Sequence, residues 1–386
     1  AFNKHAIYAK NVNTSSPTIE GNVTTTSLKP PSLGGEKATW TQSGNIKPPL
    51  VIKDIFADSV PSTEMEDPSD PAQANSHPNT DIFYNKYLYL AEGGTINLAS
   101  GTPVAYTGSS GNRGGTIQYD SSSDSYIIDG MTNQICNILV KTHETAGGNL
   151  QIANACISKH IKAYGKITIT GDITTSNVAV LHVNSDDVSE KLNINSGVLI
   201  NGDLIIRGGD AIVTTGNTLL QTLSVNGGLL WEPGNSGGTL EIGDATIDAS
   251  SSILKSAVAI VNTSNPARLT ISGTSVTVTV GENQSSVFTV YSSGQTDISV
   301  NSTVTFNGPP YLDGKTTILA FSEAGSSSVS LGSTSNAVNV EGLIYSYGAN
   351  GEGNITISNA NTQVNGVLIA NNDVTLNAAS ITYNGK

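Results

Sequence analysis

Hydrophobic and polar residues alternate in short runs along most of the chain after about residue 82. The runs cover residues 166–173, 192–195, 198–206, 240–247, 276–280, 355–357 and 374–376. Glycine, asparagine and aspartate separate them, and helical periodicity is nearly absent after residue 160. Short strands with a period of two, broken by turn residues, predict an all-β fold.

A recurring unit, apolar-x-apolar-x-Gly-x-apolar, favours one all-β architecture. It is found at residues 167–173, 198–204, 338–343 and 363–369. Glycine suits a sharp corner between two short strands because it tolerates positive φ. Self-similarity at a spacing of roughly 20 residues is typical of repeat architectures. The unit therefore predicts the coils of a right-handed parallel β-helix, a β-solenoid.

The alternative architecture is an array of β-sandwich domains. Such domains usually carry core aromatic residues at regular intervals, whereas Trp40 and Trp231 are the only tryptophans of this chain. The β-helix is therefore favoured, and residues 91–386 are predicted to form it. Equivalent residues on neighbouring coils would lie about 4.8 Å apart, which allows ladders of like side chains.

Residues 1–90 differ in composition from the rest of the chain. Nine of the fourteen prolines lie there, and proline removes the backbone donors that a β-ladder needs. This region is predicted to be irregular and to pack partly on the solenoid, as a cap or along a flank. The runs 6–9 and 50–56 are its candidate strands, and residues 59–80 are predicted to be a long surface loop.

The charge of the chain argues against several classes of protein. Charged residues make up 13% of the sequence, the formal net charge is −13, and only three residues are arginine. Such a low charge density excludes a charged helical bundle, and the scarcity of basic residues disfavours binding to nucleic acid. No stretch reaches the roughly 18 apolar residues needed to cross a bilayer. A composition rich in Asn, Ser, Thr and Gly predicts a secreted β protein.

The chain has two cysteines, Cys136 and Cys156. Neither has a second cysteine or a histidine at metal-binding spacing, so a zinc site is not predicted. In an extracellular protein the pair most simply forms a disulfide, which would stabilise the fold by about 3 kcal/mol. The alternative is two buried free thiols.

No catalytic residue is predicted. The five histidines lie in no metal-binding or catalytic motif, and the sequence shows no nucleophile motif or phosphate-binding loop. A polysaccharide-active β-helix enzyme, a lyase or a glycosidase, is the alternative function, because its site needs only convergent carboxylates with a basic residue. The best candidates are Asp172, Asp203 and Asp244 at predicted corners, with Arg207 near Asp203 and Asp210 in the sequence. Aspartate at a corner is explained more simply by hydrogen bonds to its own backbone.

One acidic cluster is a candidate for a metal site. Glu64, Glu66, Asp67 and Asp70 lie close together in the proline-containing stretch, and carboxylates at this spacing are weak candidates for a Ca²⁺ site. They lack the ordered ligand pattern of an EF-hand, so a solvated acidic loop is favoured. No metal and no cofactor is predicted, with Ca²⁺ as the one alternative.

Both ends of the chain carry a shared strand pattern. It covers residues 6–12 and 19–23, and again residues 340–346, 353–357, 364–370, 372–376 and 381–383. In this pattern the chain resembles the exported part of large minor-pilin-like proteins of the PilX type. Bactofilin-type polymer-forming β-helices share the same pattern of Asn-Gly followed by apolar residues.

The resemblance implies a cell-surface protein associated with a pilus or a secretion apparatus, whose β-helix ectodomain serves as an adhesin or tip structure. The implied partners are pilus or secretion-system subunits, or surface glycans. Pilins are anchored by an N-terminal hydrophobic helix that this sequence does not contain, so attachment to a membrane is expected only through such a helix. The expected function is that of an extracellular structural or adhesive protein that binds glycans or protein partners.

Overall fold

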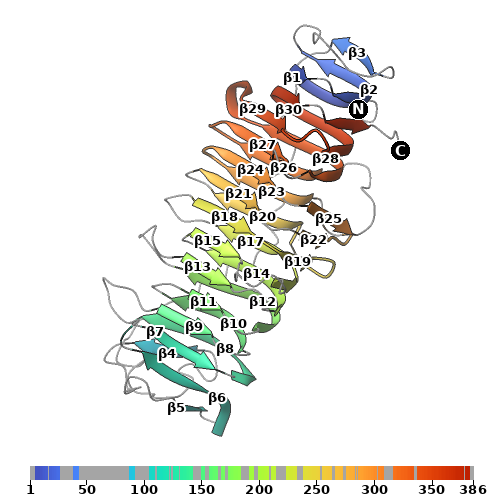
Figure 1. Ribbon diagram of the computed structural model, residues 1–386. Helices are drawn as coiled ribbons and strands as arrows, with labels where there is room; N and C mark the ends of the chain where they lie inside the picture. Colours follow the sequence, from blue (N-terminus) through green and yellow to red (C-terminus); the bar gives the residue numbers. More distant parts are fainter. Residues whose placement is uncertain are drawn as a thin grey trace. The chain divides into compact units, whose positions relative to one another are not determined.

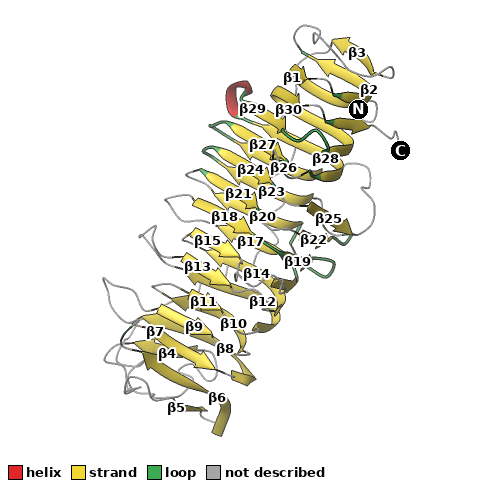
Figure 2. Ribbon diagram, viewed as in Figure 1, coloured by secondary structure: helices red, strands yellow, loops and turns green. Residues whose placement is uncertain are grey.

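The computed structural model is all-β, as the sequence predicts (Figure 2). It describes residues 5–15, 17–26, 38–42, 87–91, 104–108, 111–120, 122, 125–129, 131–141, 149–152, 156–163, 167–169, 173–183, 191–194, 199–207, 210–213, 223–232, 238–252, 254–262, 266–272, 275–282, 284, 286–301, 303–307, 316–333, 337–377 and 379–382. Within these ranges the one helical element is a short 3₁₀ turn, η1 (Ala349–Gly351). None of the described helices is long or apolar enough to cross a membrane.

The chain forms two compact units. The first consists of Ala1–Val60 and Gly237–Lys386, and the second of Pro61–Ser236. The candidate strand at residues 50–56 and the predicted loop at residues 59–80 lie outside the described residues.

The second unit contains strands β4 to β17. Their bounds are β4 Tyr87–Ala91, β5 Val104–Gly108, β6 Gly111–Asp120, β7 Ser125–Asp129, β8 Met131–Lys141, β9 Asn149–Ile152, β10 Cys156–Ala163, β11 Ile167–Ile169, β12 Ile173–Val183, β13 Lys191–Ile194, β14 Leu199–Arg207, β15 Asp210–Val213, β16 Leu223–Asn226 and β17 Leu229–Glu232. Strands β8, β10, β12 and β14 form one parallel ladder, and β9, β11, β13 and β15 form another. Only β5, β6 and β7 pair antiparallel among the described strands.

The first unit contains strands β18 to β31 together with β1 to β3. Their bounds are β18 Gly238–Ile242, β19 Ala245–Asp248, β20 Ser256–Asn262, β21 Ala267–Ile271, β22 Ser275–Thr279, β23 Ser286–Ser292, β24 Thr296–Val300, β25 Thr303–Asn307, β26 Thr316–Ser322, β27 Ser327–Leu331, β28 Asn339–Tyr347, β29 Gly353–Ile357, β30 Gln363–Asn377, β31 Ser380–Thr382, β1 His5–Ser15, β2 Thr18–Thr25 and β3 Ala38–Gln42. The predicted strand runs at 240–247, 276–280, 355–357 and 374–376 all fall on these strands, and the run 6–9 falls on β1.

Every strand pair described in the first unit is parallel. From β18 to β24, each strand pairs with the third strand after it along the chain, which produces three ladders side by side. One ladder is β18–β21–β24–β27–β29, the second is β20–β23–β26–β28 and the third is β19–β22–β25. The chain thus passes through all three ladders before it returns one strand further along each.

The N-terminal strands continue the ladders beyond the C-terminal strands. Strand β30 pairs with β28 and β29 on one side and with β1 on the other, so that β1 lies beside β30 in Figure 1. Strand β2 pairs with both β1 and β31, and β3 pairs with β2. In space, strands β1 to β3 therefore come after the last strands of the sequence.

Period-two alternation separates the core from the surface in these ladders. In β24, Ile298 and Val300 are buried, whereas Asp297 and Ser299, which alternate with them, are partly exposed. Strands β27 and β29 repeat the same burial pattern. The aliphatic residues stack on their equivalents in the next strand, which forms one continuous inner row.

Glycines form the corners that the recurring sequence unit predicts. Gly202 and Gly342, from two of the repeats, adopt positive φ of 125° and 104°, and Gly21 adopts 126°. These angles lie in a region that residues with a Cβ rarely adopt. Gly342 is paired in register with Gly366, the corner glycine of the last repeat. Gly342 and Gly366 are therefore structurally equivalent positions, and each lies within a strand, β28 and β30, rather than between two strands.

Candidate functional site

Short polar side chains line the outer face of the ladder β18–β21–β24–β27–β29. Two rows make up this surface, which we call the polar face. The first row is Thr239, Arg268, Asp297, Ser328 and Asn354, and the second is Glu241, Thr270, Ser299, Ser330 and Thr356. Thr375 of β30 and Asn13 of β1 extend the second row by two strands.

The register of the parallel strands creates these rows. Each strand places a polar residue between two buried aliphatic ones, and neighbouring strands pair without a shift from β18 to β29. Equivalent residues therefore lie about 4.8 Å apart across the strands and about 6.6 Å apart along them. The result is a regular grid of hydroxyl, amide and carboxylate groups on a sheet surface.

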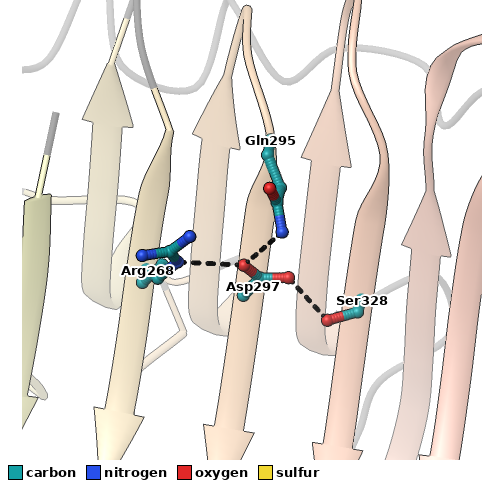
Figure 3. A network of polar contacts seen from close by, with 4 residues as sticks. All are labelled: Arg268, Gln295, Asp297 and Ser328. Atoms are coloured by element: carbon teal, nitrogen blue, oxygen red, sulfur yellow. Dashed lines mark hydrogen bonds and ion pairs between the residues drawn. The ribbon is translucent and has the colours of Figure 1, made fainter.

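Asp297 is the centre of a hydrogen-bonded network on this face (Figure 3). Its Oδ2 atom lies 3.1 Å from Nε of Arg268 and accepts a hydrogen bond of 2.8 Å from Nε2 of Gln295. Its Oδ1 atom accepts a hydrogen bond of 2.7 Å from the Ser328 hydroxyl. Three strands and one corner thus contribute side chains to a single carboxylate.

A second network continues the polar face toward the N-terminal strands. Asn354 Oδ1 accepts hydrogen bonds from Asn372 Nδ2 at 3.0 Å and from the backbone N–H of Asp373 at 3.3 Å. Asp373 in turn accepts a hydrogen bond of 2.7 Å from Asn11 Nδ2 on β1. The amide groups of the face are held in fixed orientations, so its donors and acceptors are preorganised.

The chemistry of the polar face suits binding rather than proton transfer. Serine and threonine hydroxyls donate and accept hydrogen bonds, and the ion pair with Arg268 already engages Asp297. Within the described ranges, no group of three or more His, Cys, Asp or Glu side chains could hold a metal ion. The face offers many weak polar contacts over an extended area, which matches a polar ligand of similar length.

We expect Asp297 to contribute little to stability. The free energy of unfolding of the Asp297→Ala variant should differ from that of the parent chain by about 1 kcal/mol or less. The reason is that the side chain of Arg268 is 51% exposed and that of Asp297 is 25% exposed. Exposed ion pairs of this kind contribute only a few tenths of a kcal/mol to about 1 kcal/mol. Urea denaturation followed by circular dichroism measures the difference, and a loss above about 2 kcal/mol would contradict this assignment.

Three aromatic rings stack on the neighbouring ladder. The ring centroids of Tyr291 and Phe321 are 5.7 Å apart with an interplanar angle of 5°, and those of Phe321 and Tyr347 are 5.4 Å apart at 13°. The three residues occupy the same register position on β23, β26 and β28. Because the central ring is covered on both faces, the stack presents ring edges outward.

Burial raises the pKa of Tyr291, and a hydrogen bond with the Glu323 side chain raises it further.

Stability should fall at alkaline pH because of Tyr345. Burial raises the pKa of its hydroxyl, and the hydroxyls of Tyr347 and Tyr8 raise it further. The unfolded chain therefore releases this proton at a pH near 10, where the folded chain still holds it. The contribution of Tyr345 is complete below pH 10 and is lost as the pH rises above 10. Denaturation midpoints measured from pH 8 to 11.5 test this expectation. The Tyr345→Phe variant should lose less stability over this pH range than the parent chain, and an equal loss in both would contradict the prediction.

No family model, curated protein or solved structure corresponds to this chain. The functional assignment therefore depends on the geometry described above.

The structure accounts for one of the corner aspartates. Asp203 is buried, and its Oδ1 accepts a hydrogen bond of 2.7 Å from the backbone N–H of Gly228. It therefore fixes the corner beside the next strand, as expected for turn chemistry. Asp244 lies half-buried in the turn between β18 and β19, and Asp172 lies outside the described residues. Arg207 and Asp210 fall on β14 and β15, but their side chains are not among those described.

The cysteine pair lies on two neighbouring strands. Cys136 of β8 is opposite Ser158 of β10, and Cys156 of β10 is opposite Met131 of β8. The described side chains include no disulfide, but those of Cys136 and Cys156 are not among them, so the disulfide remains a prediction. The weak Ca²⁺ candidates Glu64, Glu66, Asp67 and Asp70 also lie outside the described residues.

Sequence reasoning did not identify the polar face. The signal was present in four five-residue segments, Ala-Arg-Leu-Thr-Ile, Thr-Asp-Ile-Ser-Val, Ser-Ser-Val-Ser-Leu and Gly-Asn-Ile-Thr-Ile, which become β21, β24, β27 and β29. Each has polar residues at its second and fourth positions and aliphatic residues at its third and fifth. Other strands and loops separate the segments, so they align only after the strands are recognised.

Proposed function

We propose that this chain is an extracellular structural or adhesive protein that binds surface glycans or protein partners through its polar face. The observation that carries the proposal is the pair of polar rows running across β18, β21, β24, β27 and β29. Sugars present hydroxyl groups that both donate and accept hydrogen bonds, and side-chain hydroxyls, amides and carboxylates can satisfy them. An extended array of such groups favours an extended ligand, because each single contact contributes little.

The winding of the chain supports a structural role. We propose that the three parallel ladders are the faces of a right-handed parallel β-helix, because parallel strands joined by crossovers are right-handed in nearly all known cases. A stack of this kind buries a continuous aliphatic row and keeps its surface residues in fixed register. It therefore provides a rigid support for a binding face.

The proposed association with a pilus or secretion apparatus depends on the minor-pilin-like pattern at the two chain ends. Most of that pattern falls on β28, β29, β30 and β31, and its N-terminal part on β1 and β2. These strands pair with one another, so the residues that carry the resemblance form one continuous part of the first unit.

Substitutions on the polar face test the proposed binding. The variant Thr270→Arg/Ser299→Arg/Ser330→Arg places three long charged side chains in the second row, where they would block an extended ligand. The control variant Thr246→Arg/Thr305→Arg changes exposed residues on β19 and β25, in a different ladder. Binding is measured on a glycan microarray and to purified pilus fractions.

We expect the parent chain and the control to bind a common set of ligands, and the polar-face variant to bind them at least tenfold more weakly. Equal loss in both variants, or no binding by the parent chain, would overturn the proposal. A reducing-end assay on the bound glycans examines the enzymatic alternative. Release of new chain ends by the parent chain would replace adhesion by polysaccharide cleavage as the function.

A further inference from the structure

The N-terminal strands pair with a part of the chain that is distant in sequence. Asn11 of β1 donates its hydrogen bond to Asp373 of β30, 362 residues away. Strand β1 matches β30 at eight positions, from Ile7 opposite Leu368 to Ser15 opposite Asn377. Strands β1 and β2 therefore pair with the last strands of the chain, and these pairs can form only after the last strands have been made.

The surface that receives β1 continues the hydrophobic core. Leu368 and Val374 of β30 are fully buried, and Ile7 and Val12 of β1 cover them. Without β1, the edge of β30 would expose both its backbone hydrogen-bonding groups and these apolar side chains. Open edges of this kind recruit another strand. Strand β2 adds three pairs with β31, and the backbone N–H of Thr18 donates to Ala379 O at 3.0 Å.

A second copy of the chain offers the same receiving edge. Residues 43–86 connect β3 to β4 and could span up to about 145 Å at about 3.3 Å per residue. The connection is therefore long enough for the N-terminal strands to reach another molecule. All contacts of β1 and β2 with β30 and β31 would be unchanged, because the two copies are identical. Exchange of an identical element between protomers is a low-cost route to assembly.

We propose that residues 5–42 exchange between copies of this protein, so that β1 and β2 of one molecule complete the edge formed by β30 and β31 of another. Reciprocal exchange produces a closed dimer, and one-way exchange produces a linear chain of subunits. The partner is a second copy of this chain, and the exchange does not depend on what the polar face binds.

Engineered cysteines distinguish exchange from docking within one molecule. Asn13 of β1 and Thr375 of β30 are opposite one another, so their Cα atoms are about 4.8 Å apart, within disulfide range. One full-length chain carries Asn13→Cys and another carries Thr375→Cys, each with Cys136→Ser and Cys156→Ser. The two chains are unfolded together, refolded, oxidised and analysed on a non-reducing gel. A single chain with both new cysteines reports docking within one molecule.

The matched control pairs the Asn13→Cys chain with a Thr356→Cys chain. Thr356 of β29 is two strands from β1, about 9.6 Å away, which is too far for a disulfide. We expect at least ten times more covalent heterodimer from the Asn13→Cys and Thr375→Cys mixture than from the control. While the dimer is the minor species, its ratio to monomer should rise about tenfold for each tenfold increase in protein concentration.

Two results would overturn the proposal. In the first, the mixture gives no more heterodimer than the control, while the double-cysteine chain cross-links within itself. In the second, the double-cysteine chain fails to cross-link at all, because the pairing of β1 with β30 would then be absent.

Discussion

Replacement of Gly366 by alanine is expected to lower the free energy of unfolding by about 3–5 kcal/mol. A Cβ atom built on Gly366 would lie 1.9 Å from the carbonyl oxygen of Gly342, and 2.7 Å from its carbonyl carbon. Both are backbone atoms of the paired strand, so no side-chain rotation can relieve the clash. Overpacking of this kind usually costs about 1–3 kcal/mol, and more when the backbone must move.

Two control variants separate this clash from other effects of alanine. Gly351 has a positive φ of 79°, but its nearest heavy atom would be 3.7 Å from the new Cβ. Gly351→Ala should therefore cost only the backbone strain, about 1 kcal/mol. Asn365→Ala changes the exposed neighbour of Gly366 and should alter stability by about 0.5 kcal/mol or less. Chemical denaturation measures all three, and an equal effect of Gly366→Ala and Gly351→Ala would disprove the close approach of the two corners.

Phe288→Ala is expected to be the second most disruptive change, with a loss of about 3–5 kcal/mol. Phe288 is completely buried on β23, and it lies in register between Val258 of β20 and Ile318 of β26. Truncation leaves a cavity that strands on both sides cannot close, since their backbone hydrogen bonds fix the spacing. Losses of this size are typical for buried aromatic residues replaced by alanine.

The loss in the free energy of unfolding should depend on the size of the cavity. Phe288→Leu fills most of the volume and should cost about 1–2 kcal/mol. Thr305→Ala, on an exposed position of β25, should change stability by about 0.5 kcal/mol or less. Thermal unfolding followed by far-ultraviolet circular dichroism would detect the order Phe288→Ala, Phe288→Leu, Thr305→Ala. If Phe288→Ala is as stable as Thr305→Ala, the row of Val258, Phe288 and Ile318 does not form part of the core.

Local pattern made most strands predictable, and the glycine corners with them. The run at 240–247 became β18 and β19, and the run at 276–280 became β22, because period-two alternation already marks the buried and exposed faces. The unit around Gly342 predicted a corner, because few residues other than glycine adopt positive φ. The antiparallel pairing of β5, β6 and β7 was not predicted, because alternation is the same in parallel and antiparallel strands.

The polar face required knowledge of which strands are neighbours. Arg268, Asp297 and Ser328 come from three segments that are separated by other strands and loops, and nothing within one segment indicates that they meet. Their contact depends on register, which parallel pairing and the stacked aliphatic residues fix together. The hydrogen bond between Asn11 and Asp373 also depends on strand register, so it could not be predicted from the sequence either.

The sequence alone determined that this protein is all-β, that its strands have one apolar and one polar side, and that glycine forms the corners. These properties follow from side-chain chemistry and from backbone angles over a few residues. Only the tertiary structure decided the partner of each strand, the alignment of the polar rows and the placement of β1 beside β30. Backbone hydrogen bonds are alike for every parallel pair, so the choice of partner depends on packing between residues hundreds of positions apart.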